Sequence, residues 1–317
     1  MYKVMLRDNM APIAKEILEA TGKIKVVVDN DKNNSVPEVL SEIIKDFDGI
    51  GIRSGTRITP EILKNASKLK VVARAGVGVD NVNIKECAKK DIVVMNAPGG
   101  NAITTAEHAI ALIMSLARNI PRGTSTLKNG EWAKKKLIGV ELTGKTLGIA
   151  GLGKIGKIVA DRAAGLHMKV IAADPFVSVE EAKEAGAELV ELDNLYKHSD
   201  FITLHVPKLP ETEKMINSET LSKMKKGVRL INCSRGEVID LDALYDALIK
   251  KDVAGAALDV FPVEPPDYSM PIMQLDNVIL TPHLGASTKD AQIKVAEMIA
   301  NQMSAYLLEG KIINSVN

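Results

Sequence analysis

Cysteine is scarce in this sequence: two of the 317 residues, Cys87 and Cys233, stand far apart in the chain. Two distant cysteines supply neither a disulfide framework nor the closely spaced ligand pairs of a zinc site. We therefore expect no structural disulfide and no metal centre. A reducing compartment, the cytoplasm, is the predicted location.

An excess of one charge and a long apolar run are lacking as well. The 41 basic and 40 acidic residues give a net charge of +1, which provides no bulk attraction to nucleic acid or an anionic membrane. The apolar stretch 109–116 is too short for a bilayer, which takes about 20 residues. The strand-like start at residues 4–6 does not resemble a signal peptide. With only 3% aromatic residues, a soluble globular protein with an aliphatic core is predicted.

The length and the apolar pattern indicate two α/β domains. At roughly 150 residues per domain, the chain is long enough for two. Short runs rich in Val and Ile alternate with amphipathic helix patterns, which predicts parallel sheets covered by helices. The expected strands are residues 2–6, 24–28, 49–52, 71–73 and 92–95 in the first part, and 147–150, 170–173, 201–204, 228–231, 255–258 and 278–280 in the second.

Two long helix patterns flank the second part. One covers residues 101–120, with Thr104 and Glu107 as a predicted capping box, and its length of ~27 Å would bridge two domains. The other ends the chain, with Ser287 and Asp290 as a predicted capping box and Gly310 as its stop. The sequence leaves the place of this last helix open, and packing on the first domain is one possibility.

Three glycines form the most informative motif. Gly151, Gly153 and Gly156 follow a predicted strand and open an apolar helix pattern over residues 158–166. The first permits a tight turn, the second lets the backbone approach a pyrophosphate, and the third lets the helix pack on the strand. The helix N-terminus offers N–H groups and partial positive charge to the phosphates. In this context the motif predicts a dinucleotide-binding Rossmann domain.

Asp174 predicts which dinucleotide is bound. It ends the second strand of the motif, 18 residues after Gly156 (174 − 156), close to the offset of about 20 expected for a ribose-binding acid. Its carboxylate would accept hydrogen bonds from ribose hydroxyls and repel a 2′-phosphate. Pro175 and Phe176 offer no arginine to receive such a phosphate, so NAD is favoured over NADP.

Arginine is scarce, with nine residues against 32 lysines. Three of the nine, Arg53, Arg74 and Arg235, stand in glycine-containing turns at the ends of predicted strands. The carboxyl ends of strands form the ligand crevice of open α/β sheets, and arginine grips carboxylates and phosphates with two hydrogen bonds. Anion binding is therefore favoured over a role as solvated surface.

His283 is the histidine best suited to be a general acid or base. It follows a predicted strand in a tight, exposed turn, and histidine titrates near neutral pH. His205, after the strand 201–204, fits a place in the cofactor crevice and a structural role equally well. His108 is predicted to pack within its helix, and the other two histidines to lie on the surface.

Glu264 stands between prolines after the predicted strand 255–258. On spacing alone, a solvated loop acid is the simpler interpretation. The alternative is that its carboxylate pairs with His283 and fixes the tautomer of that ring. The spacing does not decide between the two.

Six segments together resemble the D-isomer-specific 2-hydroxyacid dehydrogenases over nearly the whole chain. Within that family, residues 96–101 and 284–288 are most similar to members that oxidise D-3-phosphoglycerate. The activity implied is NAD-dependent oxidation of D-3-phosphoglycerate to 3-phosphohydroxypyruvate, the first step of serine biosynthesis. The segments are residues 74–81, 96–101 continuing into 105–108, 151–156, 232–236, 257–266 and 282–288.

The resemblance also implies an architecture of two Rossmann-like, doubly wound domains. A discontinuous, flavodoxin-like substrate-binding domain would comprise residues 1–97 and the C-terminal helix in residues 285–317. The NAD-binding Rossmann domain would comprise residues 98–284. By the same resemblance, members are dimers joined through the cofactor domain and the segment around Trp132, so a homodimer or homotetramer is expected. The basic cluster Lys134–Lys136 would then reach the substrate phosphate of a partner.

Roles for individual residues follow from the same resemblance. Arg235 would bind the substrate carboxylate and carbonyl, Glu264 would pair with His283, and His283 would exchange the hydroxyl proton. The implied NAD contacts are Val77, Gly151, Gly153, Lys154, Ile155, Gly156, Asp174, His205, Val206, Pro207, Cys233, Ser234, Arg235, Asp259, His283 and Gly285. The implied substrate contacts are Arg53, Ser54, Arg74, Ala75, Gly76, Asn101, Arg235 and His283.

Two departures and two alternatives accompany the resemblance. Many members that oxidise phosphoglycerate carry C-terminal regulatory domains that bind serine, and with an end at Asn317 that feedback site is expected to be missing. Val77 stands where some relatives have threonine. A reductase of glyoxylate, hydroxypyruvate or another 2-keto acid is the alternative enzyme. A non-enzymatic NAD sensor, like the corepressors that share this fold, is the alternative outside catalysis.

Overall fold

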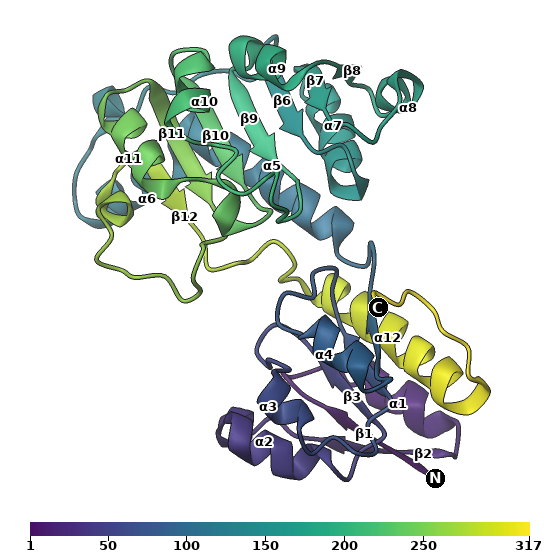
Figure 1. Cartoon of the computed structure of the whole chain (residues 1–317). Coiled ribbons are helices and arrows are strands. Elements are labelled where there is room, and N and C mark those ends of the chain that lie inside the picture. The colour runs from purple at the N-terminus through teal and green to yellow at the C-terminus, as the bar shows by residue number, and fades with distance from the viewer. The chain divides into compact units, whose positions relative to one another are not determined.

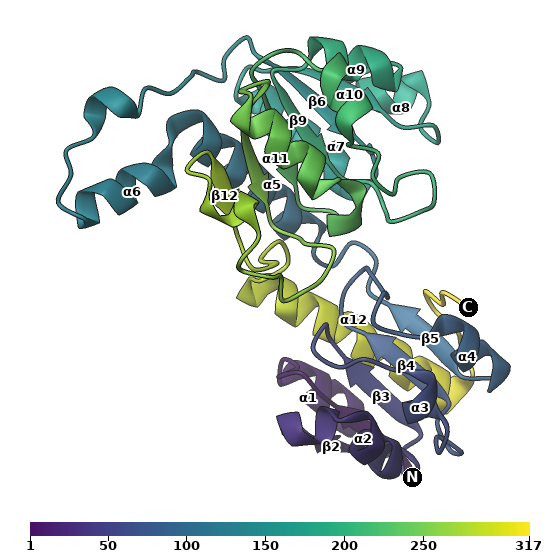
Figure 2. The ribbon, with the colours of Figure 1, turned by 60° about the vertical axis from the view of Figure 1, so that its left-hand side comes forward.

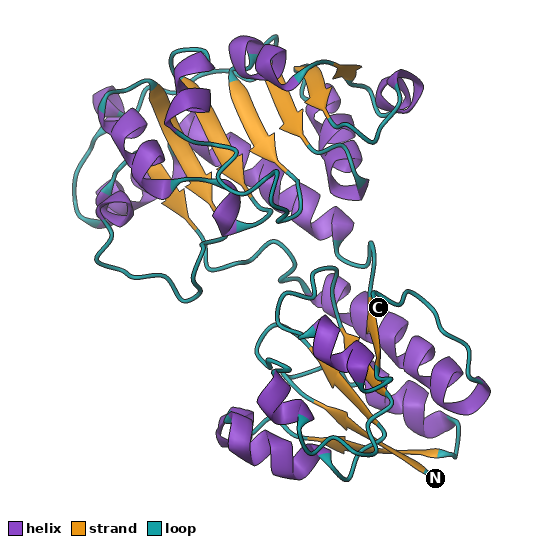
Figure 3. Cartoon of the chain, viewed as in Figure 1, coloured by secondary structure: helices purple, strands orange, loops and turns teal.

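The computed structural model describes all residues from 1 to 317, which form two compact units. Unit 1 comprises Met1–Asn101 and Ala286–Asn317, and unit 2 comprises Ala102–Gly285. Each unit is a parallel sheet between helices, so the α/β class with a discontinuous first unit is confirmed (Figure 3). No helix of the chain has both the length and the apolarity needed to cross a membrane.

Unit 1 contains a five-stranded parallel sheet in the order β2-β1-β3-β4-β5. This is the flavodoxin-like order, in which β2 lies on one side of β1 and the later strands are added on the other side. Figure 1 labels β1, β2 and β3, and Figure 2 labels β4 and β5. The strands are β1 (Tyr2–Leu6), β2 (Ile24–Val28), β3 (Gly49–Ile52), β4 (Val71–Arg74) and β5 (Val93–Asn96). The helices are α1 (Ile13–Ala20), α2 (Pro37–Ile44), α3 (Pro60–Leu63) and α4 (Ile84–Lys89), with a 3₁₀ turn η1 (Lys32–Ser35).

Both faces of this sheet are buried, which explains the continuous apolar runs of its strands. Val4 and Leu6 pack with α1 and the C-terminal helix on one face, while Met5 packs with α2 and α3 on the other. Alternate side chains of a strand point to opposite faces. A single strand therefore contributes to two separate clusters.

The C-terminal helix α12 (Lys289–Glu309) belongs to unit 1, which settles the place that the sequence left open. Val295, Ile299 and Met303 are buried in one cluster with side chains of the sheet and α1, and Figure 2 shows α12 running along the strands of this unit. The predicted capping box was wrong by one residue: Thr288 is the N-cap, and its hydroxyl accepts a hydrogen bond from Ala291 N at 3.2 Å. The helix ends at Gly310, whose φ of +72° suits glycine.

Unit 2 contains a seven-stranded parallel sheet in the order β12-β11-β10-β9-β6-β7-β8. The central strand is β6, with β7 and β8 on one side and β9 to β12 added in order on the other. This is the Rossmann arrangement. The strands are β6 (Thr146–Ala150), β7 (Lys169–Ala173), β8 (Glu188–Leu189), β9 (Phe201–Leu204), β10 (Val228–Asn232), β11 (Val253–Leu258) and β12 (Val278–Leu280). The two-residue strand β8 was not predicted.

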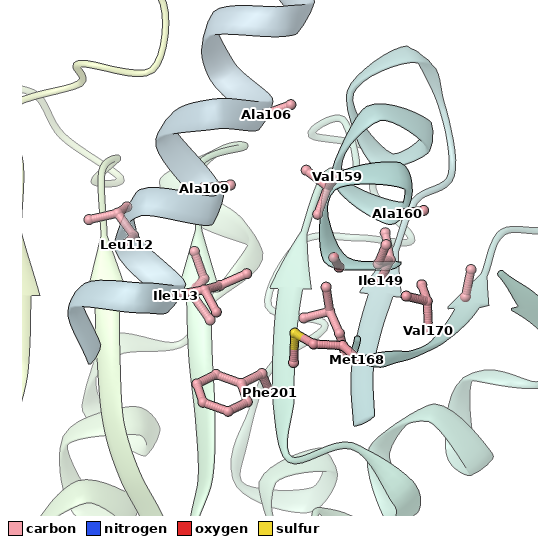
Figure 4. Packing of buried hydrophobic residues seen from close by; sticks show 14 of the residues in the cluster. Ala106, Ala109, Leu112, Ile113, Ile149, Val159, Ala160, Met168, Val170 and Phe201 are labelled. Carbon is pink, nitrogen blue, oxygen red and sulfur yellow. The ribbon is translucent and has the colours of Figure 1, made fainter. Parts of the chain in front are cut away.

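Helices cover both faces of this sheet. Figure 4 shows Ala106 and Ala109 of α5 pointing toward α7, from which Val159 points back, within one buried cluster. The helices are α5 (Ala102–Arg118), α6 (Ile120–Lys128), α7 (Lys154–Gly165), α8 (Val179–Glu184), α9 (Leu192–His198), α10 (Ser218–Lys223) and α11 (Leu241–Ile249). Short 3₁₀ turns are η2 (Lys134–Lys136), η3 (Gly236–Val238) and η4 (Pro271–Gln274).

The predicted helix over residues 101–120 is two helices. Because α5 begins at Ala102, Thr104 lies inside its first turn, and the predicted capping box of Thr104 and Glu107 was wrong. Asn119 has a φ of +52°, outside the helical range, and separates α5 from α6. The whole of α5 lies in unit 2 and packs on α7, β10 and β11.

Residues 119–139 form an excursion that leaves the sheet of unit 2 and returns to its own start. Val140 N donates to Ala117 O at 2.8 Å, so the two ends are joined. Figure 2 shows α6 and the following loop projecting from the sheet of this unit. Four large apolar side chains of the excursion are exposed: Ile120, Leu127, Trp132 and Ile138.

Candidate active site

The turn between β6 and α7 has the backbone that its three glycines predict. Gly151 has a φ of +92°, which favours glycine. A Cβ on Gly156 would overlap Gly151 O, so helix and turn can pack this closely only without a side chain. A Cβ on Gly153, the N-cap of α7, would point into open space. The first turn of α7 therefore faces an open region with N–H groups that have no intrahelical partner.

Asp174 is held beside this turn by two backbone hydrogen bonds. Its Oδ2 accepts from Leu152 N at 2.8 Å and its Oδ1 accepts from Phe176 N at 2.9 Å. Each carboxylate oxygen has a second lone pair for another donor. The open space above Gly153, the helix N-terminus and this fixed acid fit the pyrophosphate and ribose of NAD.

His283 and Glu264, whose pairing the sequence left undecided, meet in the structure. His283 Nδ1 lies 2.7 Å from Glu264 Oε2, and Glu264 Oε1 accepts a hydrogen bond from Phe261 N at 3.1 Å. With the proton on Nδ1, the ring donates to Glu264 and keeps Nε2 as an acceptor. The side chains of His283 and Glu264 are 46% and 38% exposed, so both remain accessible.

The charge state of Glu264 follows from its neighbours. Burial of the carboxyl raises its pKa, but the hydrogen bond and charge of His283 and the bond from Phe261 N outweigh burial and lower the pKa below its ordinary value. The carboxylate stays ionised to more acidic pH than a free glutamate. Its contribution to folding is present above its unfolded pKa and is lost as the pH falls through the lower folded value.

The turn that carries His283 is fixed by Asp259. The buried carboxylate of Asp259 accepts hydrogen bonds from Leu284 N at 2.7 Å, Gly285 N at 2.8 Å and the Thr281 hydroxyl at 2.6 Å. His283 itself has a φ of +54° and donates its N–H to Asp259 O at 2.9 Å. Asp259 thus holds the general acid/base candidate in an otherwise unfavourable backbone conformation.

His108 completes the surroundings of Asp259. Its Nε2 lies 3.2 Å from Asp259 Oδ1, which agrees with the predicted packed histidine but adds a partner 151 residues away. Burial raises the pKa of Asp259, yet the hydrogen bonds from His108, Thr281 and Leu284 N outweigh it and lower the pKa. The sequence contained no spacing that would have linked His108 to this acid.

His108, Asp259 and Cys233 form a group of potential metal ligands whose donor atoms lie within 4.8 Å of one another. Both oxygens of Asp259 already accept hydrogen bonds. Burial raises the pKa of the Cys233 thiol. The hydrogen bonds from His108, Thr281 and the backbone already account for the position of the Asp259 carboxylate without an ion.

Arg235 follows β10, beside the strands that precede Glu264 and His283. Its backbone carbonyl accepts a hydrogen bond from Asn232 Nδ2 at 2.8 Å, and its Nη1 donates to Ser234 O at 2.7 Å. A Cβ on Gly236 would overlap the Phe261 backbone. This close approach brings the loop of Arg235 against the loop that leads to Glu264.

His205 follows β9 with an enclosed ring. Its Nε2 lies 3.0 Å from Thr203 Oγ1, and its buried Nδ1 has no hydrogen-bond partner. Burial lowers the pKa of His205 to about 4. The ring is therefore neutral near pH 7, which fits both roles that the sequence left open. A contact with the cofactor remains a prediction.

This pKa predicts a pH-dependent stability. The unfolded chain binds the proton near pH 6.5 and the folded chain only near pH 4, so the stabilisation is complete above pH 6.5 and is lost as the pH falls toward 4. Over this pH range the free energy of unfolding falls by about 3 kcal/mol because of the pKa shift of His205. His205→Gln should remove that part of the pH dependence of the unfolding free energy, measured by hydrogen exchange of the β6 and β9 amides. His198→Gln, at an exposed position, is the control. Parallel pH curves for wild type and His205→Gln would contradict the assignment.

The other candidate contacts lie at the carboxyl edges of the two sheets. In unit 2 these are Lys154, Ile155, Val206, Pro207, Cys233, Ser234 and Gly285. In unit 1, Arg53 follows β3 and Arg74 is the last residue of β4. These strands are neighbours in the sheet, with Ile52 opposite Arg74. Ser54, Ala75, Gly76 and Val77 follow in the same loops, and Asn101 precedes α5.

A family model decides the classification of unit 2. The D-isomer specific 2-hydroxyacid dehydrogenase, NAD binding domain, matches residues 110–285. The chain belongs to this family. The carboxyl edge described above is therefore that of an NAD-binding domain of D-2-hydroxyacid dehydrogenases.

Curated relatives and solved structures agree with this membership. D-3-phosphoglycerate dehydrogenases of Synechocystis and Methanocaldococcus jannaschii are 46% and 44% identical over 97% and 100% of this chain. The matches cover 54% and 59% of those relatives, so the chain spans a little over half of their length. The structure of Aquifex aeolicus D-lactate dehydrogenase complexed with NAD and lactic acid is 32% identical, with a TM-score of 0.84. That match covers 99% of this chain and 98% of the other.

Proposed function

We propose that the protein oxidises D-3-phosphoglycerate to 3-phosphohydroxypyruvate with NAD, the entry reaction of serine biosynthesis. The observation that carries the chemistry is the His283–Glu264 pair, with 2.7 Å between Nδ1 and Oε2, beside Arg235 at the carboxyl edge of an NAD-binding domain. The choice of substrate is supported by the names of the two curated relatives described above.

Three side chains have separate roles in this proposal. The guanidinium of Arg235 binds the substrate carboxylate and prevents rotation of the C2 centre. His283 Nε2 accepts the C2 hydroxyl proton and returns it in the reverse direction. Glu264 holds the ring through Nδ1 and stabilises the imidazolium that forms. Bound NAD would supply the hydride acceptor.

The phosphate of the substrate requires a second anion-binding group, for which unit 1 offers Arg53, Ser54 and Arg74. The two arginines stand on adjacent parallel strands, with Ile52 opposite Arg74. A Cβ on Gly76, whose φ is +153°, would overlap the Arg74 guanidinium. Glycine thus leaves the space that this guanidinium occupies. Two guanidinium groups suit a phosphate dianion.

The deciding experiment is an initial-rate assay. NAD reduction is measured with D-3-phosphoglycerate, D-glycerate and D-lactate, and each is repeated with NADP. We expect the highest kcat/KM with D-3-phosphoglycerate and NAD, because Asp174 would repel a 2′-phosphate. Preference for the unphosphorylated acids, or for glyoxylate or hydroxypyruvate in the reverse direction, would instead identify a general 2-keto acid reductase. No turnover of any 2-hydroxy acid would support the NAD sensor.

We also propose that two copies of the chain associate through the 119–139 excursion. Trp132 is 79% exposed, and three more large apolar side chains are exposed on the same excursion. Clustered exposed apolar residues are typical of interfaces.

Light scattering tests this association. We expect wild type at twice the chain mass of 34.1 kDa and Trp132→Glu at the single-chain mass. Ile249→Glu, an exposed apolar position of unit 2 outside the excursion, should leave the mass unchanged. A single-chain mass for wild type, or the doubled mass for Trp132→Glu, would exclude this interface.

A further inference from the structure

The segment of unit 1 that carries Arg53 is held at both ends by side chains that the proposed mechanism does not use. This segment, Arg53, Ser54, Gly55 and Thr56, follows β3 at the carboxyl edge of the sheet. Asp8, two residues after the end of β1 and outside every predicted set of site residues, accepts hydrogen bonds from Arg53 N at 2.7 Å and Thr56 N at 3.0 Å through Oδ2. Its Oδ1 accepts from the Thr56 hydroxyl at 2.7 Å.

The carbonyl groups of the same segment are fixed from the other side. Asn81 Nδ2 donates to Arg53 O at 2.7 Å and to Thr56 O at 2.6 Å. The first and last residues of the segment are therefore bound through both N–H and C=O groups. Only Ser54 and Gly55 between them are exposed.

Asp8 is itself part of a buried network. Thr56 Oγ1, which donates to Asp8, accepts a hydrogen bond from Arg7 Nε at 3.1 Å. Arg7 is 2% exposed and forms an ion pair with Asp29. Buried ion pairs of this kind hold their geometry because breaking them is costly. The rigid sheet edge thus fixes Asp8, and Asp8 fixes the segment.

We propose that Asp8 is a positioning residue that holds the 53–56 segment in its anion-binding conformation and so sets the affinity for the phosphorylated substrate. This rests on the proposed function, in which Arg53 binds the substrate phosphate. Asp8 acts through backbone hydrogen bonds to Arg53 and Thr56 and takes no part in proton or hydride transfer. Preorganising a loop raises affinity because binding no longer has to order it.

Removal of Asp8 would change KM for the substrate in opposite directions through a charge effect and through a positioning effect. The carboxylate repels an anionic substrate, so if charge alone mattered, removing it would lower KM. If Asp8 positions the segment, Asp8→Ala raises KM for D-3-phosphoglycerate about tenfold or more, with kcat and KM for NAD within about twofold of wild type. Asp8→Asn should restore most of the affinity. Its amide oxygen can accept from both N–H groups, and its NH₂ can donate to Thr56 Oγ1.

Asp48→Ala is the matched control. Asp48 is also a partly buried acid of unit 1 that accepts a backbone hydrogen bond, from Lys3 N at 2.9 Å, but it lies at the amino end of the sheet. Asp48→Ala should lower the free energy of unfolding without changing KM for D-3-phosphoglycerate. Urea unfolding of each variant shows that the enzyme is folded under assay conditions.

The double variant separates failure of this proposal from failure of the proposed function. In an Arg53→Ala background, Asp8→Ala should raise KM by a clearly smaller factor than in wild type, because Ser54 is the only proposed phosphate-binding residue of the segment that remains. If Arg53→Ala raises KM and Asp8→Ala does not, or if the two effects multiply, the positioning role is wrong. If Arg53→Ala leaves KM unchanged, the substrate role of Arg53 in the proposed function is wrong.

Discussion

His283→Ala is expected to lower kcat for NAD reduction by D-3-phosphoglycerate by ~10²–10⁴-fold, the usual contribution of a general base. The ring combines an accessible nitrogen, Nε2, with a fixed carboxylate partner, Glu264, 2.7 Å from Nδ1. The affinity for NADH, measured by fluorescence titration, should stay close to wild type because the phosphate turn and Asp174 are untouched. Steady-state initial rates measure the loss of kcat.

Two further variants make the His283 result specific. His198→Ala removes an exposed histidine of α9 and should leave kcat unchanged. Glu264→Gln should lower kcat by less than His283→Ala. A glutamine has a single acceptor oxygen, so its NH₂ group must face either Phe261 N–H or His283 Nδ1–H, and one of the two hydrogen bonds is lost. A kcat for His283→Ala within about threefold of wild type would remove His283 from the mechanism.

Arg235→Ala is expected to lower kcat/KM for D-3-phosphoglycerate at least ~10²-fold, comparable to losing one charge-stabilising donor. The guanidinium would bind the carboxylate and polarise the developing carbonyl, so both the binding and the chemical step lose an interaction. Arg235→Lys should recover part of the loss, because lysine keeps the charge but not the two-bond geometry. The measurement is the full initial-rate profile in substrate concentration.

Arg229→Ala provides the comparison for Arg235. Arg229 lies in β10, where its guanidinium packs over the Phe201 ring away from the carboxyl edge. It should change stability more than turnover. An Arg235→Ala enzyme with kcat/KM within about threefold of wild type would show that another group binds the carboxylate.

The fold could be predicted from the sequence because its strands are buried on both faces. Runs such as residues 2–6 and 201–204 are mostly apolar, with one polar residue each, and match the observed β1 and β9. The errors occurred where local chemistry is ambiguous. Glu188 and Leu189 form a strand of two residues that no pattern reveals. Thr104 and Ser287 resemble caps in sequence, but the helices begin two residues before the first and two residues after the second.

The candidate site was predictable only as separate loops. Glycine spacing and Asp174 identified the cofactor turn, because the motif lies within 30 residues and its geometry is local. Glu264 and His283 are 19 residues apart on two loops, and their contact depends on the parallel pairing of β11 with β12. His108 and Asp8 were missed because their partners lie 151 and 45 or more residues away, and no periodicity encodes such contacts.

The three side chains proposed for the chemistry, Arg235, Glu264 and His283, all follow neighbouring strands of one sheet in unit 2. The segment proposed to recognise the phosphate belongs to a different unit, with its own core and its own hydrogen-bond network. Substitutions at residues 53–56 therefore leave the reacting groups in place. In this proposal, a few substitutions in the first unit would change which hydroxy acid is bound, while the proposed reacting groups of the second unit stay unchanged.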